Sequence, residues 1–156
     1  MSSETIFEQG GEWKADAHGL KFAIIVARFN SAITEKLLEG AREALTKAGA
    51  SGVQVFRVPG AFELPYAARR LANDYDAIVA LGAVIRGETP HFDYVAGAAA
   101  HGLQQAALET GTPVAFGVLT TNSVAEAEAR AGGDHGNKGY DAAMTAIEMA
   151  RFRQSS

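Results

Sequence analysis

Residues 87–91 combine groups that could hold an anion and move a proton. The segment reads Gly-Glu-Thr-Pro-His. Pro90 suits the first position of a helix, where a main-chain N–H is not needed, and Thr89 before it can cap the helix. A glycine-bearing loop that runs into a helix collects free main-chain N–H groups at the positive end of the helix dipole. The segment therefore predicts an anion site formed by the main chain of Gly87, Glu88 and Thr89.

His91 would lie in the first turn of that helix, within reach of the bound anion. Its imidazole, with an ordinary pKa of about 6.5, is suited to carrying protons near neutral pH. The carboxylate of Glu88 would repel an anion, so we expect this side chain to point away. Each signal is weak alone, because a histidine at a helix start is more often structural and Thr-Pro is simply a good cap.

The elements that position this segment alternate along the chain. Apolar runs rich in β-branched residues predict four strands: Phe22–Ala27, Val53–Val58, Ala77–Gly82 and Pro113–Leu119. Helical spacing predicts a helix from Ser31 to a stop at Gly49, then Leu64–Asn73, Phe92–Glu109, about Ser123–Ala131, and Lys138–Phe152. Such alternation is typical of a parallel sheet in a three-layer α/β/α sandwich with a flavodoxin-like outline. Glycine-punctuated residues 1–20 predict a loosely attached arm, and residues 21–156 a single domain.

Ligands of such sheets bind beyond the carboxyl ends of the strands. Four loops follow the predicted strands: 28–30, 59–63, 83–91 and 120–122. The sequence has no GxGxxG after its first strand, no P-loop, no aspartate where a phosphate-receiving domain needs one, and no GxSxG elbow. It also has no cysteine and only four dispersed histidines, so we expect no metal site.

Composition narrows the class of protein further. The 156 residues include 14 Lys and Arg against 18 Asp and Glu, a net charge of −4, which argues against nucleic acid as the main partner. The first residues, MSSETIFEQGGEW, do not have the apolar core of a signal peptide. The apolar runs are also shorter than the ~20 residues that a membrane helix needs. We therefore expect a cytoplasmic protein with no membrane partner.

An ordered series of motifs gives these residues a common interpretation. The motifs are Arg28-Phe29-Asn30, PGAFELP at 59–65, GAVIRGETPHFDYV at 82–95, Asn122, Arg130-Ala131-Gly132, and GNKG at 136–139. The series resembles the lumazine synthase family from about Phe22 to Phe152. The resemblance implies condensation of 5-amino-6-(D-ribitylamino)uracil with 3,4-dihydroxy-2-butanone 4-phosphate, without a metal or other cofactor. An amine attacks the ketone to give an imine, phosphate is eliminated, and the ring closes to a lumazine with release of water.

The resemblance also assigns roles to residues. It implies proton transfer by His91, and stacking of Phe29 on the pyrimidine. The residues implied in binding the pyrimidine and its ribityl chain are Phe29, Asn30, Ala61, Phe62, Glu63, Ala83, Val84, Ile85 and Lys138. Those implied in binding the phosphate ester are Gly87, Glu88, Thr89 and Arg130. Phe116, which its strand alone would place in the core, is implied to reach into the site of a neighbouring subunit.

Assembly follows from the same resemblance. It implies a homopentamer in which Thr5–Lys14 adds a strand to the sheet of the next subunit. The short connector Ala131–Gly139 favours twelve pentamers in a sixty-subunit shell, with riboflavin synthase as a candidate partner. Asp134 stands where many relatives carry lysine, so we assign it no binding role. Two alternatives stay open: a container that has lost turnover, and an unrelated flavodoxin-like module that binds flavin.

Overall fold

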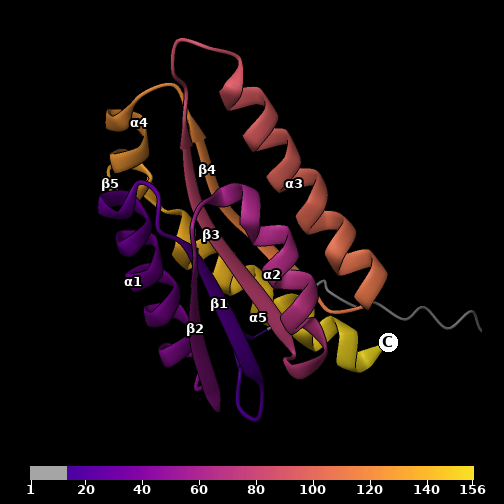
Figure 1. Ribbon diagram of the computed structural model, residues 1–156. Helices are drawn as coiled ribbons and strands as arrows, with labels where there is room; N and C mark the ends of the chain where they lie inside the picture. Colours follow the sequence, from indigo (N-terminus) through magenta and orange to yellow (C-terminus); the bar gives the residue numbers. More distant parts are fainter. Residues whose placement is uncertain (1–13) are drawn as a thin grey trace, which may run out of the picture.

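A computed structural model describes residues 14–156. A single parallel sheet has the order β2-β1-β3-β4, from strands Gly52–Val58, Lys21–Ala27, Ala77–Ile85 and Val114–Thr121. Helices α1 (Ser31–Lys47) and α5 (Lys138–Ser155) cover one face, while α2 (Leu64–Leu71) and α3 (His91–Thr110) cover the other (Figure 1). The prediction of a flavodoxin-like three-layer sandwich is confirmed.

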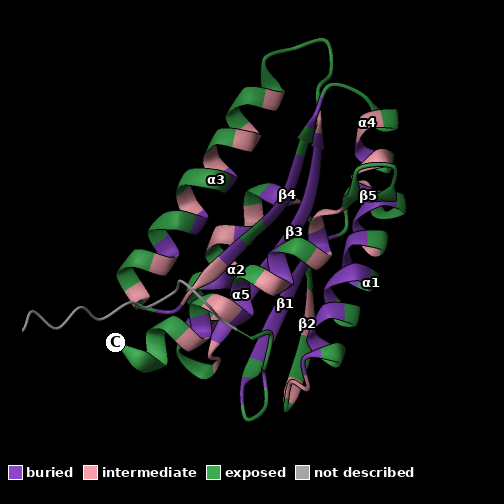
Figure 2. Ribbon diagram, turned by 180° about the vertical axis from the view of Figure 1, so that it is seen from behind, coloured by how far each residue is buried: buried purple, intermediate pink, exposed green. Residues whose placement is uncertain are grey.

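The core lies in two layers, one on each face of the sheet. Strands β1 and β3 are buried almost throughout and are largely purple in Figure 2, whereas the edge strand β2 is only half-buried. Residues that alternate along β1 enter different layers: Ile24 packs toward α1 and α5, and Ile25 toward α2 and α3. Burial on both faces explains why the central strands are continuous apolar runs. No helix within residues 14–156 combines the length and hydrophobicity needed to cross a membrane.

Several element ends differ from the prediction. Strands β3 and β4 continue through segments predicted as loops, because Ala83–Ile85 pair in parallel with Leu119–Thr121. The helix predicted over 64–73 ends at Leu71 and is followed by a 3₁₀ turn, Ala72–Asp74. Another 3₁₀ turn, Ala61–Glu63, leads into α2. After α4 (Val124–Ala129), the connector forms a small hairpin of β5 (Ala131–Gly133) and β6 (Gly136–Asn137).

Helices α1 and α5 approach so closely that a glycine is required between them. A Cβ on Gly139 would lie 2.0 Å from the carbonyl oxygen of Leu37. Asn137 caps α5 by accepting hydrogen bonds from the N–H groups of Gly139 (2.8 Å) and Tyr140 (3.1 Å). Its Nδ2 donates to the Lys36 carbonyl oxygen of α1 at 3.0 Å. The start of α5, and the hairpin before it, are thereby fixed against α1.

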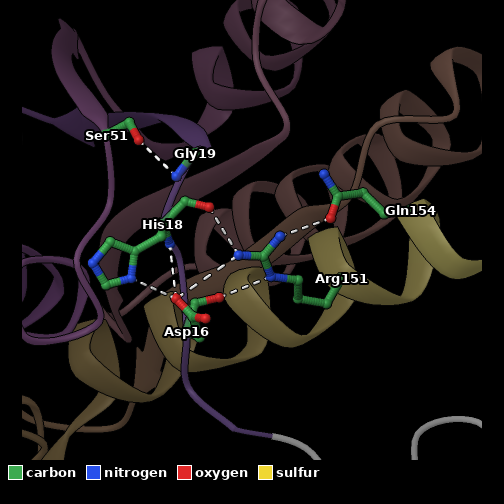
Figure 3. A network of polar contacts seen from close by, with 6 residues as sticks. All are labelled: Asp16, His18, Gly19, Ser51, Arg151 and Gln154. Atoms are coloured by element: carbon green, nitrogen blue, oxygen red, sulfur yellow. Dashed lines mark hydrogen bonds and ion pairs between the residues drawn. The ribbon is translucent and has the colours of Figure 1, made fainter.

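Residues 16–20 are held against α5 by hydrogen bonds from Arg151 (Figure 3). Arg151 donates from Nε to the Asp16 carbonyl oxygen (2.8 Å) and from Nη2 to the His18 carbonyl oxygen (2.9 Å). Oδ1 of Asp16 accepts from the main-chain N–H of His18 at 3.0 Å. Ala17 and Leu20 are buried. Loose attachment is therefore wrong for this part of the arm, while residues 5–13 of the predicted exchanged strand lie outside the described residues.

Candidate active site

A cleft of about 740 Å³ opens at the carboxyl edge of the sheet, where the ends of β1, β2 and β3 meet. The chain order reverses here, since β2 and β3 lie on opposite sides of β1. Parallel sheets leave a crevice at such a point. The lining includes most of the residues predicted for the site: Phe29, Asn30, Ala61, Phe62, Glu63, Ala83, Val84, Ile85, Gly87, Thr89 and His91.

The walls of this cleft include large aromatic surfaces exposed to solvent. Phe29 is 71% exposed and Phe62 60% exposed. Burial of a phenyl ring stabilises a fold, so two exposed rings in one concave site indicate a ligand surface rather than core. A phenylalanine at the end of a strand is more often a core residue, but Phe29 is not one.

Asn30 forms part of the floor of the cleft. Its φ of 64° is the only positive φ of a non-glycine residue within residues 14–156. This left-handed conformation turns the chain from β1 directly into α1. The side chain then donates from Nδ2 to the carbonyl oxygen of Ala83 at 2.8 Å. Asn30, predicted to contact the pyrimidine, thus also joins the ends of β1 and β3.

Glu63 and Phe29 share one corner of the cleft. A Cβ on Gly60 would lie 3.3 Å from Oε1 of Glu63 and 4.0 Å from Cβ of Phe29. The small residue therefore leaves room for a carboxylate beside an aromatic ring. A carboxylate accepts strong hydrogen bonds from hydroxyl groups, and a ring offers a flat apolar face. This corner can hold a ligand that carries both a heterocycle and a polyol.

The loop 86–90 leads from β3 into α3. Pro90 occupies the N-cap position, one residue earlier than predicted, and its side chain cannot accept a hydrogen bond. The hydroxyl oxygen of Thr89 accepts from the His91 N–H at 3.4 Å, which is a long hydrogen bond. Gly87, Thr89 and His91 line the cleft, whereas Glu88 is exposed outside that lining. The helix start therefore faces the cleft as an anion site requires.

Three residues predicted for the site line a different cavity. Phe116 of β4, Arg130 and Lys138 line a space of about 420 Å³ together with His135 and Asp141. Nη1 of Arg130 donates to the main-chain carbonyl oxygen of Glu126 at 3.0 Å, which fixes its direction. The structure thus divides the predicted residues between two cavities of one chain. His135 and Asp141 were not selected from the sequence, and only their closeness to the GNKG motif could have indicated them.

Asp134 faces another part of the surface from its neighbour His135. It lines a cavity of about 890 Å³ with Glu39, Glu43 and Glu128. The carboxylate therefore gathers with other acidic residues, on α1 and α4, rather than beside Arg130. These side chains do not form a metal site, because no three His, Asp or Glu side chains within residues 14–156 lie so that they could hold one metal ion.

The fold and the cleft define a flavodoxin-like α/β protein with a cleft that could take a small ligand, at the point where the strand order of its sheet reverses. Comparison with known proteins makes this specific. The family model for 6,7-dimethyl-8-ribityllumazine synthase matches residues 19–154. A protein of that name from Syntrophus aciditrophicus is 56% identical over 142 residues, which cover 88% of this chain and 92% of the relative. Proteins of the same name from two Thermus thermophilus strains are 58% identical over 143 residues, which cover 89% of this chain and 91% of each relative.

The chain therefore belongs to the 6,7-dimethyl-8-ribityllumazine synthase family. The resemblance of the sequence motifs to this family is confirmed. Members of the family are transferases of riboflavin biosynthesis.

Proposed function

We propose that the cleft and the cavity around Arg130 are two halves of one active site, completed between neighbouring subunits. There this member of the lumazine synthase family condenses 5-amino-6-(D-ribitylamino)uracil with 3,4-dihydroxy-2-butanone 4-phosphate. One observation carries the proposal: Arg130 and Lys138 line the same cavity as Phe116, apart from the cleft that holds His91. The resemblance to the family implies that Phe116 serves a neighbour's site. Arg130 and Lys138 would then serve that neighbour as well.

The cleft supplies the pyrimidine half of this site. Phe29 offers a flat exposed face for the uracil ring, and Glu63 offers acceptors for ribityl hydroxyls. Main-chain groups of Ala83–Ile85 border the ring edge. The Ala83 carbonyl oxygen already accepts from Asn30, and the side of this segment that faces β4 is paired. Pairing with β1 ends at Leu81, so the main-chain groups on that side are left to read the uracil.

The start of α3 and Arg130 would hold the phosphate ester from two sides. Main-chain N–H groups at Gly87–Thr89 and the helix dipole attract an anion. The guanidinium of Arg130 can bind two phosphate oxygens at once, which an ammonium cannot. Holding the phosphate fixes the carbonyl carbon near the attacking amine and prepares the phosphate to leave.

His91 is the candidate for proton transfer. Imine formation needs a proton on the departing water, and elimination of phosphate needs removal of a proton from carbon. The His91 imidazole lies at the helix start beside the proposed phosphate site, where it can serve both steps. The reaction as written needs no electron transfer and no metal.

Subunit mixing tests whether the halves come from different chains. His91→Ala is expected to have a lower kcat and Arg130→Ala a higher KM for the phosphate ester, so each protein should have low activity when that substrate is well below its KM. Reassembled together, roughly a quarter of the sites in a randomly mixed ring would combine an intact His91 with an intact Arg130. Formation of the lumazine, followed by its absorbance and fluorescence, should then recover toward that fraction. Mixtures no more active than either parent would contradict a shared site.

The same assay separates the alternatives. An unsubstituted protein that assembles but forms no lumazine would be a container, and one that copurifies with FMN without condensing the substrates would be a flavin-binding module. Light scattering distinguishes a pentamer from a sixty-subunit shell, which the short connector Ala131–Gly139 favours. Partnership with riboflavin synthase and a cytoplasmic location stay predictions.

A further inference from the structure

The first turn of α3, which carries His91, is anchored on one side only. Phe92 is partly buried against the core, whereas the fully buried residues of α3 begin at Ala99, two turns further on. Its N-cap is a proline, and the hydrogen bond from the His91 N–H to Thr89 is long at 3.4 Å. A proton-transfer group must be held to within about an ångström of its working position. A contact besides the packing of Phe92 is therefore needed to fix this turn.

The side chain of Arg86 makes that contact in three directions. Its Nε donates to Oδ1 of Asn122 at 2.9 Å, beyond the end of β4. Its guanidinium carbon lies 4.3 Å from the ring centroid of Phe92, the residue after His91. Its Nη2 is 3.8 Å from Oδ1 of Asp93. One side chain thus joins the first turn of α3 to the neighbouring strand end.

The acceptor of this bridge is itself held in place. The main-chain N–H of Asn122 donates to Oε1 of Glu126 at 2.7 Å, and the Glu126 N–H donates to the Ser123 hydroxyl at 3.1 Å. Arg86 also donates its main-chain N–H to the Thr121 carbonyl oxygen at 2.8 Å. Asn122 therefore stands on a capped helix start, and it can serve as a fixed support.

We propose that Arg86 is a positioning residue for the phosphate loop and for His91. The planar guanidinium stacks on Phe92 and at the same time donates to Asn122 from its edge, which the ammonium of lysine cannot do. The role of Arg86 therefore depends on the planar shape of its guanidinium as much as on its charge. This inference rests on the proposed function, since it assigns Arg86 to the loop that would hold the phosphate ester.

The test compares steady-state kinetics of Arg86→Ala and Arg86→Lys with Arg69→Ala as a matched control. Arg69 of α2 pairs with Glu109 at the opposite end of α3, so its loss removes an arginine contact to the same helix without touching the loop. Arg86→Ala should lower kcat/KM for the butanone phosphate about 10- to 100-fold. The KM for the pyrimidine should change less than about twofold, and Arg69→Ala should match the parent. Arg86→Lys should resemble Arg86→Ala.

A second variant removes the acceptor of the hydrogen bond between Arg86 and Asn122. Asn122→Ala should give a smaller loss of the same kind, and in Arg86→Ala/Asn122→Ala the two losses should not add. If Arg86→Ala does not assemble, as judged by light scattering, Asn122→Ala carries the test alone.

Three results would overturn the assignment: Arg86→Ala kinetics equal to those of the control, full activity in Arg86→Lys, or an equal rise of both KM values. An unsubstituted protein that makes no lumazine would instead refute the proposed function. The two failures are therefore distinguishable.

Discussion

The two edges of the sheet are built for different purposes. At the amino edge, polar groups pair with one another: the Lys21 N–H donates to Asp76 (2.7 Å), the Gly19 N–H donates to Ser51 (2.6 Å), and Arg151 binds the chain at residues 16–18. At the carboxyl edge, Phe29 and Phe62 lie exposed over a large cleft. Hydrogen bonds satisfied within the chain stabilise the fold, while groups left open can bind a ligand. Substitutions at the two edges should therefore fail in different assays.

His91→Ala is the strongest test of the carboxyl edge. Loss of the imidazole should reduce kcat about 10- to 1000-fold, because positioned proton transfer contributes on that scale. The background condensation of the substrates favours the lower end of this range. Thermal unfolding should match the parent, because His91 is exposed. An unchanged kcat would mean that His91 does not transfer a proton in the reaction.

Arg130→Ala should separate the two substrates. A lost charge-assisted hydrogen bond corresponds to roughly a 10- to 100-fold rise in the KM for the phosphate ester. The KM for the pyrimidine should rise far less. Saturation curves for each substrate, taken with the other in excess, measure both values. An equal rise in the two would place Arg130 away from the phosphate.

Asn30→Ala should damage stability as well as the site, because Asn30 belongs to both. Alanine is less tolerant of the left-handed φ of 64° and cannot donate to Ala83. We expect a loss of about 1–2 kcal/mol in the free energy of unfolding. Asn30→Gly, which accepts the φ but lacks the amide, should recover part of that loss in denaturant titrations. Equal stability of the two variants would mean that the backbone conformation contributes nothing.

The amino edge should respond to acid. Hydrogen bonds from the main chain and the ring of His18 hold the pKa of the Asp16 carboxyl below its ordinary value. A lowered pKa means that the carboxylate stabilises the fold fully above the ordinary value of about 4, and that this contribution is lost as the pH falls through the lowered pKa. Asp16→Asn should therefore make the melting temperature less sensitive to pH between about 5 and 3. A parallel pH dependence in both proteins would contradict the role of Asp16.

Asp134→Lys should have the smallest effect. The side chain lines the acidic cavity beside Glu39 and Glu128, not the cavity of Arg130. The KM for the phosphate ester should stay within about twofold of the parent, since water and salt weaken the interaction between charges that are exposed to solvent. A large fall in that KM would mean that the charge of Asp134 does act on the bound phosphate.

Much of the fold could be predicted because its signals are local. The run Phe22–Ala27 is apolar on both faces, and Gly49, where we expected the first helix to stop, has a φ of 80° just after α1. The ends of β3 and β4 could not be predicted in this way. Thr120 and Thr121 belong to β4 because they pair with Val84 and Ile85, and a sequence does not display a partner strand.

The site was predicted residue by residue but not as two cavities. Phe29, Glu63 and His91 follow strand ends that converge on one edge, so topology alone places them together. Arg130 comes after the last strand of the sheet, and its distance from His91 depends on how α4 and the hairpin pack. The bridge through Arg86 was missed for a similar reason, because its acceptor Asn122 comes from a different strand end.

The contact between Gly139 and Leu37 has a consequence for any survey of substitutions in this protein. A methyl group there would force α5 away from α1, and Lys138 and the hairpin leading back to Arg130 would move with it. Gly139→Ala would then lose affinity for the phosphate ester although no atom of the residue touches it. A set of mutational data interpreted without the structure would therefore assign Gly139 a direct contact with the ligand.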